Sequence, residues 1–202
     1  EGHDGYIFNL ISLDPITMAS CSEDKKIIIW NLNTGERKFE INKAHMHCIY
    51  SLCKLPERYE QFISGGFGEM KIWSIQDYHL VKTVKGHSDY ITNIKILKYD
   101  SNGPYQPNES IMEANQSIMN QSNYSSSLVK SSNNRIGLNN LNTNAPLKIV
   151  GSCSFDKTVN LWFIDTWENF ITLKGHNGNV NSIVQYNQYN NEVITCSHDK
   201  TI

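Results

Sequence analysis

The sequence predicts an all-β fold assembled from a repeated unit of four strands. Two observations support this prediction: a Gly-His or Ala-His pair recurs along the chain, and similar runs of polar and apolar residues follow each pair. His3, His45 and His87 are spaced 42 residues apart, and His176 follows after one more period and 47 extra residues. The chain of 202 residues therefore holds three units and part of a fourth.

The first predicted strand of each unit begins four positions after the histidine. An apolar residue stands there, a small polar residue follows two positions later, and a second apolar residue comes next. Such alternation is typical of a β-strand that buries one face. The three columns are Ile7, Ile49, Ile91 and Val180; Asn9, Ser51, Asn93 and Ser182; and Leu10, Leu52, Ile94 and Ile183.

Three further strands complete each unit. The second is predicted in ITMASC, QFISGG, KIVGSC and EVITCS, the third in KIIIWNL, MKIWSI and TVNLWFI, and the fourth, more weakly, in RKFEI, HLVKTV and NFITL. Turn sequences such as Asn33-Thr34-Gly35 suit the hairpins between these strands. The predicted units span residues 1–43, 44–85, 86–174 and 175–202.

The 47 extra residues fall between the first and second strands of the third unit, at about 101–147. This stretch is rich in Asn and Ser, has almost no periodicity and contains three prolines. It holds too few apolar residues to offset the entropy of ordering, so we expect a disordered insert. Two roles stay open for the insert: a passive insertion, or a phosphorylated or partner-binding segment.

Composition and charge argue against several classes of partner. Hydrophobic residues make up 39% and charged residues 19%, as in an ordinary soluble globular domain. The net charge is -2, the pI is about 6.4 and no Lys/Arg cluster exceeds a pair, so we expect no nucleic acid and no membrane among the partners. The stretch EGHDGYIFNL shows no export signal, so we expect an intracellular protein, cytoplasmic with the nucleus left open.

The stretch SCSFDKTVNLW, residues 152–162, raises the question of catalysis. It contains Ser152 and Asp156, and His176 follows downstream. A Ser, a His and an Asp form a hydrolase triad when they converge once, beside an oxyanion site. Here near-copies recur at a fixed period, each with a Trp position that no triad requires, so the repetition favours a structural motif. We therefore expect no catalytic residues and no enzyme activity in this segment.

A 42-residue period of four strands, opening with Gly-His and closing its third strand on Trp, resembles the WD40 repeat family. The distance from His to Trp supports the resemblance: it is 27 residues in the first unit, 28 in the second, and 28 in the third once the insert is left out. The resemblance covers the whole chain except the insert. It implies a β-propeller segment of three four-stranded blades plus the first strands of a fourth. Rings of this family commonly have seven blades, so we expect further blades of the same chain to pack against this segment.

The sequence departs from the family pattern mainly in the second unit. None of the three units has Asp after its Trp, because Asn31, Ser74 and Phe163 stand there. The second unit also opens with Ala44 in place of Gly, and Gly68 occupies the turn position that an Asp holds in the other units. The second blade is therefore the degenerate one.

The resemblance implies one buried hydrogen-bond network in each blade, running from Asp to His to Ser or Thr to Trp. The chemistry is coherent: a carboxylate accepts from one imidazole nitrogen, a hydroxyl donates to the other, and the indole N–H finds an acceptor. The cysteines that follow the network hydroxyl, Cys21, Cys153 and Cys196, are expected to be small buried apolar residues. The network residues are His3, Ser20, Asp24 and Trp30; His45, Ser64 and Trp73; His87, Ser152, Asp156 and Trp162; and His176, Thr195 and Asp199.

The resemblance also implies a function, since propellers of this family present their narrower face to peptides and protein domains. The loops before the first strand and between the second and third form that face. Carried over by position, its residues are Asp4, Tyr6 and Glu23; Met46, Cys48 and Phe67; Ser88, Tyr90 and Phe155; and Asn177, Asn179 and His198. The insert is expected to leave from the opposite face.

Four aromatic residues of this set stand out as candidate binding residues: Tyr6, Phe67, Tyr90 and Phe155. Large aromatics on rigid exposed turns are typical of binding hot spots. The alternative for each is that it merely covers neighbouring side chains.

His45, His47, Cys48 and Cys53 form a cluster of metal-ligating residue types, but their spacing argues against a zinc site. His45 already has a place in the network, and Cys48 and Cys53, five apart on a strand, face opposite sides. We therefore expect no metal and no cofactor. The predicted function is a non-catalytic scaffold that binds other proteins, and the alternative is a regulatory or substrate-recruiting propeller of a larger enzyme, such as a protein kinase or ubiquitin ligase.

Overall fold

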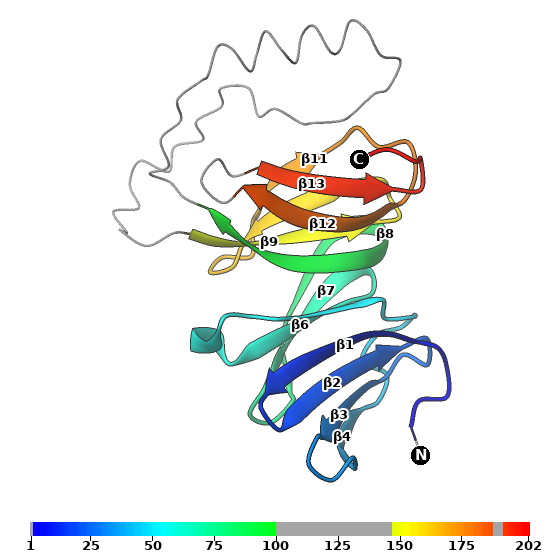
Figure 1. Cartoon of the computed structure of the whole chain (residues 1–202), viewed down its shortest axis with the longest axis vertical. Helices are drawn as coiled ribbons and strands as arrows, with labels where there is room; N and C mark the ends of the chain where they lie inside the picture. The colour runs from blue at the N-terminus through cyan, green and yellow to red at the C-terminus, as the bar shows by residue number, and fades with distance from the viewer. Residues whose placement is uncertain (1, 100–146, 188–191) are drawn as a thin grey trace, which may run out of the picture.

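The structure of the chain, a computed structural model, describes residues 2–99, 147–187 and 192–202 (Figure 1). Within these ranges every regular element is a β-strand except one short 3-10 turn, η1, at Glu57–Tyr59. The predicted all-β class is therefore confirmed. The predicted insert at about 101–147 lies outside the described residues, apart from Leu147 at the start of a strand.

The first four strands form one antiparallel sheet in chain order, at the lower end of the molecule in Figure 1. Short polar side chains close its turns: Asp14 Oδ1 accepts from the amide of Ile16 at 2.8 Å, and Asn31 Oδ1 accepts from the amide of Asn33 at 2.9 Å. The strands are β1 (Ile7–Asp14), β2 (Thr17–Ser22), β3 (Ile27–Asn31) and β4 (Arg37–Ile41).

The next seven strands join into a single sheet, in the order β11-β10-β9-β8-β7-β6-β5. The joining strand is β8, because its first half pairs with β7 and its second half pairs with β9. We predicted two strands here, one in HLVKTV and one beginning at Ile91, but the backbone between them stays extended and forms one strand of 20 residues. The strands are β5 (Ser51–Lys54), β6 (Gln61–Gly65), β7 (Phe67–Ser74), β8 (Leu80–Tyr99), β9 (Leu147–Ser154), β10 (Val159–Phe163) and β11 (Asn169–Leu173).

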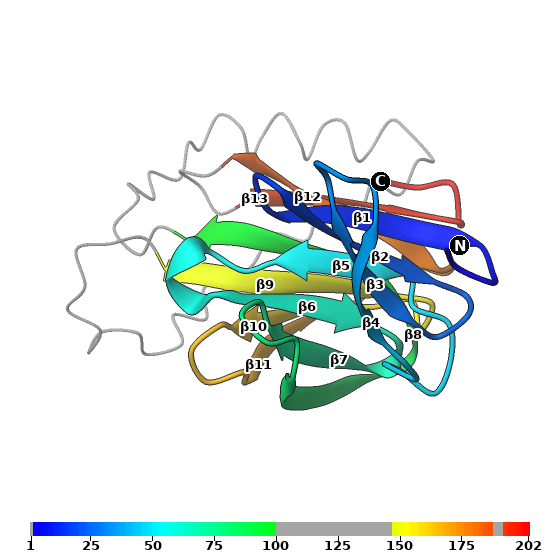
Figure 2. The ribbon, with the colours of Figure 1, turned by 90° about the horizontal axis from the view of Figure 1, so that it is seen from below.

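The last two described strands, β12 (Val180–Asn187) and β13 (Glu192–Ser197), form an antiparallel pair at the upper end of Figure 1. They coincide with the first two strands predicted for the fourth unit. The first strands of successive units are neighbours, since β1 contacts β5, β5 contacts β8, and β8 contacts β12. In Figure 1 the units follow one another from the lower to the upper end of the molecule, and Figure 2 shows them from below, from the side of the first sheet. Successive units therefore lie face to face.

Hydrophobic cores fill the spaces between successive units. The first core joins Ile27 and Ile29 of the first sheet to Phe62 of β6. The next residue of β6, Ile63, points the other way, into a second core that includes Trp162. Neighbouring residues of a strand point to opposite faces of the sheet, so a unit that lies between two others contributes to the core before it and the core after it.

The two ends of the stack leave apolar side chains exposed. Leu10 on β1 is 55% exposed, whereas Leu52 and Ile94, which hold the same place in the next two units, are buried. At the other end Val184 and Tyr186 of β12 are exposed. The difference arises because the described residues place no further sheet against either end.

One prediction about the cysteines is wrong for the same reason. Cys21 and Cys153 are fully buried, as expected, but Cys196 is exposed. Cys21 and Cys153 are covered by the core of the unit that follows them. Among the described residues no unit follows β13, so the side chain of Cys196 stays open to solvent.

Candidate interaction face and its hydrogen-bond networks

The first unit links its histidine to three side chains by hydrogen bonds. His3 Nδ1 lies 2.8 Å from Asp24 Oδ2, and His3 Nε2 lies 2.7 Å from Ser20 Oγ. The Trp30 indole N–H donates to the same Ser20 oxygen at 2.8 Å. Ser20 accepts from the indole and its hydroxyl donates to His3 Nε2, so His3 carries its proton on Nδ1 and donates it to Asp24.

The carboxylate of Asp24 also ties two loops of the face together. Its Oδ2 accepts from the amide of Asp4 at 3.0 Å, and its Oδ1 accepts from the amide of Lys26 at 2.9 Å. Burial alone would raise the pKa of Asp24, but the hydrogen bonds from these amides and from His3 outweigh it and lower the pKa. The ionised carboxylate is therefore part of the folded loop structure.

The third unit repeats this arrangement around His87. His87 Nδ1 lies 2.8 Å from Asp156 Oδ2, His87 Nε2 lies 2.8 Å from Ser152 Oγ, and the Trp162 indole donates to Ser152 at 2.9 Å. Thr158 adds a hydroxyl that donates to Asp156 Oδ1 at 2.6 Å. Burial opposes ionisation of Asp156, but its hydrogen bonds and the nearby His87 lower its pKa.

The fourth unit shows the same contacts as far as the chain extends. His176 Nδ1 lies 3.0 Å from Asp199 Oδ2, and His176 Nε2 lies 2.8 Å from Thr195 Oγ1. The amide of Asn177 donates to Asp199 at 2.8 Å. Hydrogen bonds, first among them the one from the Thr201 hydroxyl, lower the pKa of Asp199.

The second unit differs because Gly68 replaces the aspartate. His45 Nε2 lies 2.7 Å from Ser64 Oγ, and the Trp73 indole donates to Ser64 at 2.8 Å. The other nitrogen, His45 Nδ1, is buried and has no hydrogen-bond partner among the residues that the structure describes, and Glu69 Oε1 stays 3.6 Å away. Burial, followed by the nearby charge of Lys71, lowers the pKa of His45 to about 3, so the ring is neutral at pH 7.

These contacts show how Ser152 and Asp156, the triad-like residues of the stretch 152–162, are used in the fold. Ser152 does contact a His and an Asp, but the histidine is His87 and not His176, which contacts Thr195 and Asp199. Ser152 is fully buried and its oxygen already accepts from the Trp162 indole. A substrate carbonyl has no access to the Ser152 oxygen in this arrangement.

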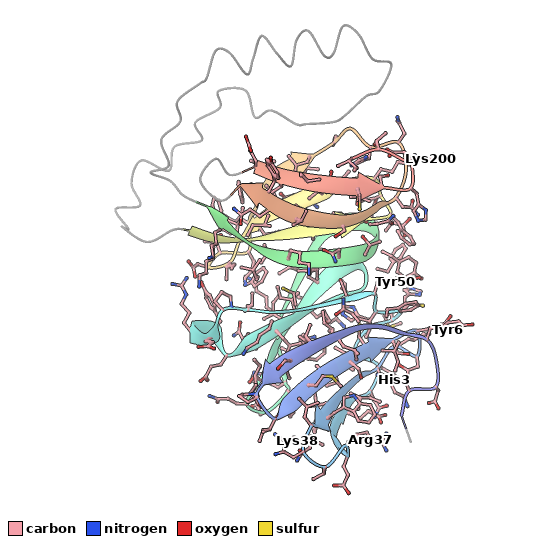
Figure 3. The ribbon with its side chains drawn as sticks, viewed as in Figure 1. His3, Tyr6, Arg37, Lys38, Tyr50 and Lys200 are labelled. Carbon is pink, nitrogen blue, oxygen red and sulfur yellow. The ribbon has the colours of Figure 1, made fainter. Side chains whose placement is uncertain are left out.

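The residues carried over as the candidate face divide into two groups by exposure. Tyr6 and Phe67 are 76% and 46% exposed. Figure 3 shows Tyr6, Tyr50 and Lys200, from three different units, along one side of the stack. The exposed members of the face are Asp4, Tyr6, Glu23, Met46, Phe67, Ser88, Asn177 and His198. The half-buried members are Cys48, Tyr90, Phe155 and Asn179.

Tyr90 lies at the centre of a group of aromatic rings on this face. Its ring centroid is 5.1 Å from that of Phe67, 5.3 Å from Tyr50 and 6.0 Å from Phe155. Phe8 of the first unit extends the group, with its ring 4.5 Å from Tyr50. We call Phe8, His47, Tyr50, Phe67, Tyr90 and Phe155 the aromatic cluster; it joins the first three units.

Sequence reasoning identified only part of this cluster. It named Phe67, Tyr90 and Phe155, which the structure brings together, and also Tyr6, whose ring makes no contact with the cluster in the described part of the chain. It missed Tyr50, which stands five positions after His45, as Phe8 does after His3. The recurrence of an aromatic residue at that place in two units was the available signal.

Two acidic side chains, Glu23 and Asp89, lie near Tyr50 of the cluster. Burial is the main reason that the pKa of Tyr50 is raised, and the neighbouring Cys48, Tyr90, Glu23 and Asp89 add to the effect. The backbone beneath the rings is held firmly, since the amide of Phe155 donates to the carbonyl of Tyr90 at 3.0 Å. The face therefore combines rigid aromatic rings with nearby negative charge.

The structure offers little support for a metal site at the four residues considered from the sequence. No group of three or more His, Cys, Asp or Glu side chains is close enough to hold a metal ion anywhere in the described residues. Burial raises the pKa of the Cys53 thiol to about 11, which disfavours the thiolate that binds metals.

Comparison with known proteins identifies the class of this fold. The sequence model of the family "WD domain, G-beta repeat" matches residues 1–31 and 167–202. Two solved structures, of U3-55K and of the RRP9 WD40 repeats, each superpose with a TM-score of 0.59 at 17% identity, covering 91% of this chain and 43% of the other. The fold is therefore that of β-propeller blades. The WD40 resemblance predicted from the sequence is confirmed by the family-model matches at these two regions and by the propeller fold.

Curated relatives are WD-repeat proteins with diverse names. Pre-mRNA-splicing factor cwf17 of Schizosaccharomyces pombe is 23% identical over 219 residues, covering all of this chain and 60% of that protein. Small ribosomal subunit protein RACK1 of Drosophila melanogaster is 32% identical over 76 residues, 37% of this chain and 23% of that protein. Nuclear distribution protein nudF 1 of Talaromyces marneffei is 27% identical over 79 residues, 39% and 17% of the two chains.

The chain spans less than two thirds of the length of each of these relatives. The WD40 family description and the two solved structures named above indicate no catalytic family. In the described ranges no helix has the length and apolar character needed to cross a membrane.

Proposed function

We propose that the chain is a non-catalytic scaffold that binds other proteins or peptides through the face that carries the aromatic cluster. WD40 propellers are typical protein-interaction scaffolds, and the cluster is the observation that supports a contact on this face. Tyr90 touches rings from two units, so a ligand seated on it would contact several blades at once.

The aromatic cluster has the properties expected of a binding hot spot. Its rings are fixed against one another, so little side-chain entropy is lost when a partner binds. Phe67 is 46% exposed and Tyr90 is half-buried, which leaves apolar surface that a partner can cover. Asp89 and Glu23 lie near the tyrosines, so cationic or neutral side chains are favoured over acidic ones.

The remaining candidate face residues would surround this centre as a polar rim. They are Asp4, Tyr6, Glu23, Met46, Cys48, Ser88, Asn177, Asn179 and His198. The relatives named as a splicing factor and as a ribosomal subunit protein support a role in an assembly, which we extend to this chain. The same names, together with the near-neutral charge, support an intracellular protein whose partners are proteins.

We propose further that the units are three blades and the first strands of a fourth in a larger ring, with boundaries at 1–43, 44–85, 86–174 and 175–202. The exposed Leu10 supports this assignment, because its counterparts Leu52, Ile94 and Ile183 are all buried by the preceding unit. Val184 and Tyr186 at the other end of the stack support it in the same way. Additional blades of the same chain would cover both ends.

Affinity capture from a cell extract, comparing the wild-type chain with Tyr90→Ala, tests the proposed function. We expect the substitution to weaken capture of a face-binding partner by at least ~30-fold, the effect of losing a hot-spot residue of about 2 kcal/mol. Phe39→Ala is the matched control, since Phe39 is an exposed aromatic on β4, outside the cluster. Equal capture by wild type and Tyr90→Ala, with the partners of both identified, would contradict the proposal.

A further inference from the structure

Glu23 brings a carboxylate from the first unit to the edge of the aromatic cluster. The residue before it, Ser22, accepts a hydrogen bond on its carbonyl from the amide of Ile49 at 3.1 Å, and Ile49 directly precedes Tyr50. In the second unit the place of Glu23, one position before the turn residue, is taken by Phe67 of the cluster. The first unit therefore puts a negative charge where the second puts an aromatic ring.

Asp89 brings a second carboxylate from the third unit. Its Oδ1 accepts from the amide of Tyr90 at 2.7 Å, so this carboxylate is fixed next to the central tyrosine of the cluster. Burial is the main reason that the pKa of Tyr50 is raised, and the charges of Glu23 and Asp89 both add to the effect. Two negative charges from different units therefore act on one tyrosine of the second unit.

Neither of these carboxylates forms an ion pair in the part of the chain that the structure describes. Lys26 Nζ lies 3.3 Å from Asp4 Oδ2 and 3.2 Å from Glu40 Oε1, so its positive charge is already shared by two other carboxylates. Lys25 and Lys157 stand in the adjoining turns, and neither of them pairs with the two carboxylates within those described residues. The site therefore has negative charge that a cationic group of a partner can neutralise.

The cluster leaves aromatic surface open to solvent close to these charges. Phe8 packs against Tyr50 with ring centroids 4.5 Å apart and is 38% exposed. Phe67 packs against Tyr90 and keeps nearly half of its surface exposed, and the two tyrosines are themselves only half-buried. The face of an aromatic ring attracts a cation that lies within about 6 Å of its centre. Exposed rings and unpaired carboxylates together favour a cation over a neutral or acidic group.

The combination of rings and carboxylates suits a guanidinium group better than an ammonium group. A guanidinium is planar and lies flat against an aromatic ring, while its N–H donors point outward in the plane toward acceptors at the edge of the ring. It bonds to carboxylates in a fixed geometry, and often through two donors at once. It is also less strongly hydrated than an ammonium group, so it loses less when it leaves water for an apolar surface.

We propose that the aromatic cluster binds the guanidinium group of an arginine presented by a partner. The guanidinium lies over the exposed parts of the Tyr50 and Tyr90 rings, and its N–H groups donate to the carboxylates of Glu23 and Asp89. An arginine in this position contacts residues of the first three units at once. The inference rests on the proposed function, because it names the chemical group by which a partner occupies this face.

Small probes test the arginine site without any partner. The chain, carrying isotope-labelled tyrosine, is titrated at neutral pH and constant ionic strength with the Nα-acetyl amide of arginine. The same titration is repeated with the corresponding derivatives of citrulline and lysine. Citrulline replaces the guanidinium by a neutral urea group of nearly the same shape, and lysine keeps the positive charge without the planar group. The ring signals of Tyr50 and Tyr90 are followed by NMR.

We expect the arginine probe to shift both tyrosine signals saturably, with a dissociation constant at least ~10-fold lower than that of the citrulline probe. The lysine probe should bind more weakly than the arginine probe. Glu23→Gln and Asp89→Asn should each weaken arginine binding by at least ~3-fold, and the asparagine keeps an oxygen that accepts from the Tyr90 amide. Glu57→Gln is the matched control and should change nothing, since Glu57 is an exposed carboxylate of η1, outside the cluster.

Three results would overturn the arginine site. The first is the citrulline or the lysine probe binding as tightly as the arginine probe, and the second is the absence of a saturable response to the arginine probe. The third is equal weakening by Glu57→Gln and by the two cluster variants. Saturable arginine binding combined with capture that does not depend on Tyr90 would contradict the proposed function and leave the arginine site standing. Capture that depends on Tyr90, without binding of the arginine probe, would do the reverse.

Discussion

Gly86 lies directly against the indole of Trp162, with no room between them for a Cβ atom. The equivalent pair in the first blade is looser, since a Cβ on Gly2 would lie 3.6 Å from Trp30 in ordinary contact. In the second blade Ala44 occupies this position and is buried. The same place in three blades therefore sets three different limits on side-chain size.

Gly86→Ala should destabilise the fold, because the added methyl group must displace Trp162 from its contact with Ser152. Overpacking of this kind typically costs ~1–3 kcal/mol. Urea unfolding followed by tryptophan fluorescence measures the effect, and Gly2→Ala is the matched control, with an expected change below ~0.5 kcal/mol. Equal losses for the two variants would show that the indole contact is not the cause.

Ser152→Ala should lower stability and leave no catalytic activity to lose. The substitution removes the acceptor of the Trp162 indole and the donor to His87 Nε2, both buried. An unpaired buried group costs about 1–3 kcal/mol, measurable by urea unfolding. An esterase assay on wild type and variant completes the test: activity that disappears while stability is unchanged would favour the catalytic interpretation.

The free energy of unfolding should depend on pH through His45. Its pKa is about 3 in the folded chain against 6.5 for an ordinary histidine, so below pH 6.5 the unfolded chain binds a proton that the folded chain does not. Stability should therefore fall as the pH drops from about 6.5 toward 3, by at most ~1.4 kcal/mol per pH unit. The contributions of Asp24 and Asp156, whose folded pKa values are lowered, are lost only below about pH 4.

Two measurements check this assignment. Urea unfolding at about pH 7, 5.5 and 4.5, on both sides of the ordinary histidine pKa of ~6.5, gives the change in unfolding free energy with pH. NMR of the imidazole ring over the same range reports the protonation of His45 directly. The ring signals of His45 should stay unchanged down to the lowest pH. Titration of His45 with a midpoint near the ordinary value would show that the ring is not held neutral by burial.

Deleting residues 101–146 should leave binding at the face intact. Lys98 and Lys148 are paired across β8 and β9, at the end of these strands away from Tyr90, and the deletion leaves residues 99, 100 and 147 between them, enough for a three-residue turn. We expect the shortened chain to fold and to capture the same partner as the full chain. Loss of capture in a folded deletion variant would mean that the sides of the propeller are assigned the wrong way round.

Much of the fold could be predicted because each repeat has a characteristic local pattern of polar and apolar residues. The periodic His, Ser and Trp positions located the strands. For example, β12 and β13 lie where the first two strands of the fourth unit were predicted. The continuous course of β8 could not be predicted in this way. A strand pattern shows which residues are extended, but the change of partner from β7 to β9 depends on how two sheets meet.

The candidate site likewise has one part that could be predicted from the local sequence and one part that depends on how the blades pack. Gly68 in place of an aspartate signalled that the second network would differ, and the structure shows the result as the unpaired Nδ1 of His45. The contact between Tyr50 and Phe155 had no comparable signal, because the two residues are more than a hundred positions apart and meet only when the blades stack. The exposure of Cys196 likewise depends on the neighbouring unit and not on its own strand.

The shared strand β8 has a mechanical consequence. No strand is shared between the first sheet and the next in the described residues, and the chain passes between them through a turn after β4 where Lys43 adopts a left-handed conformation. The following two units, by contrast, share one uninterrupted strand. Under tension the first four strands would peel away as a separate step, and the next seven would resist together. The join between the second and third blades should therefore resist separation more strongly than the join between the first and second.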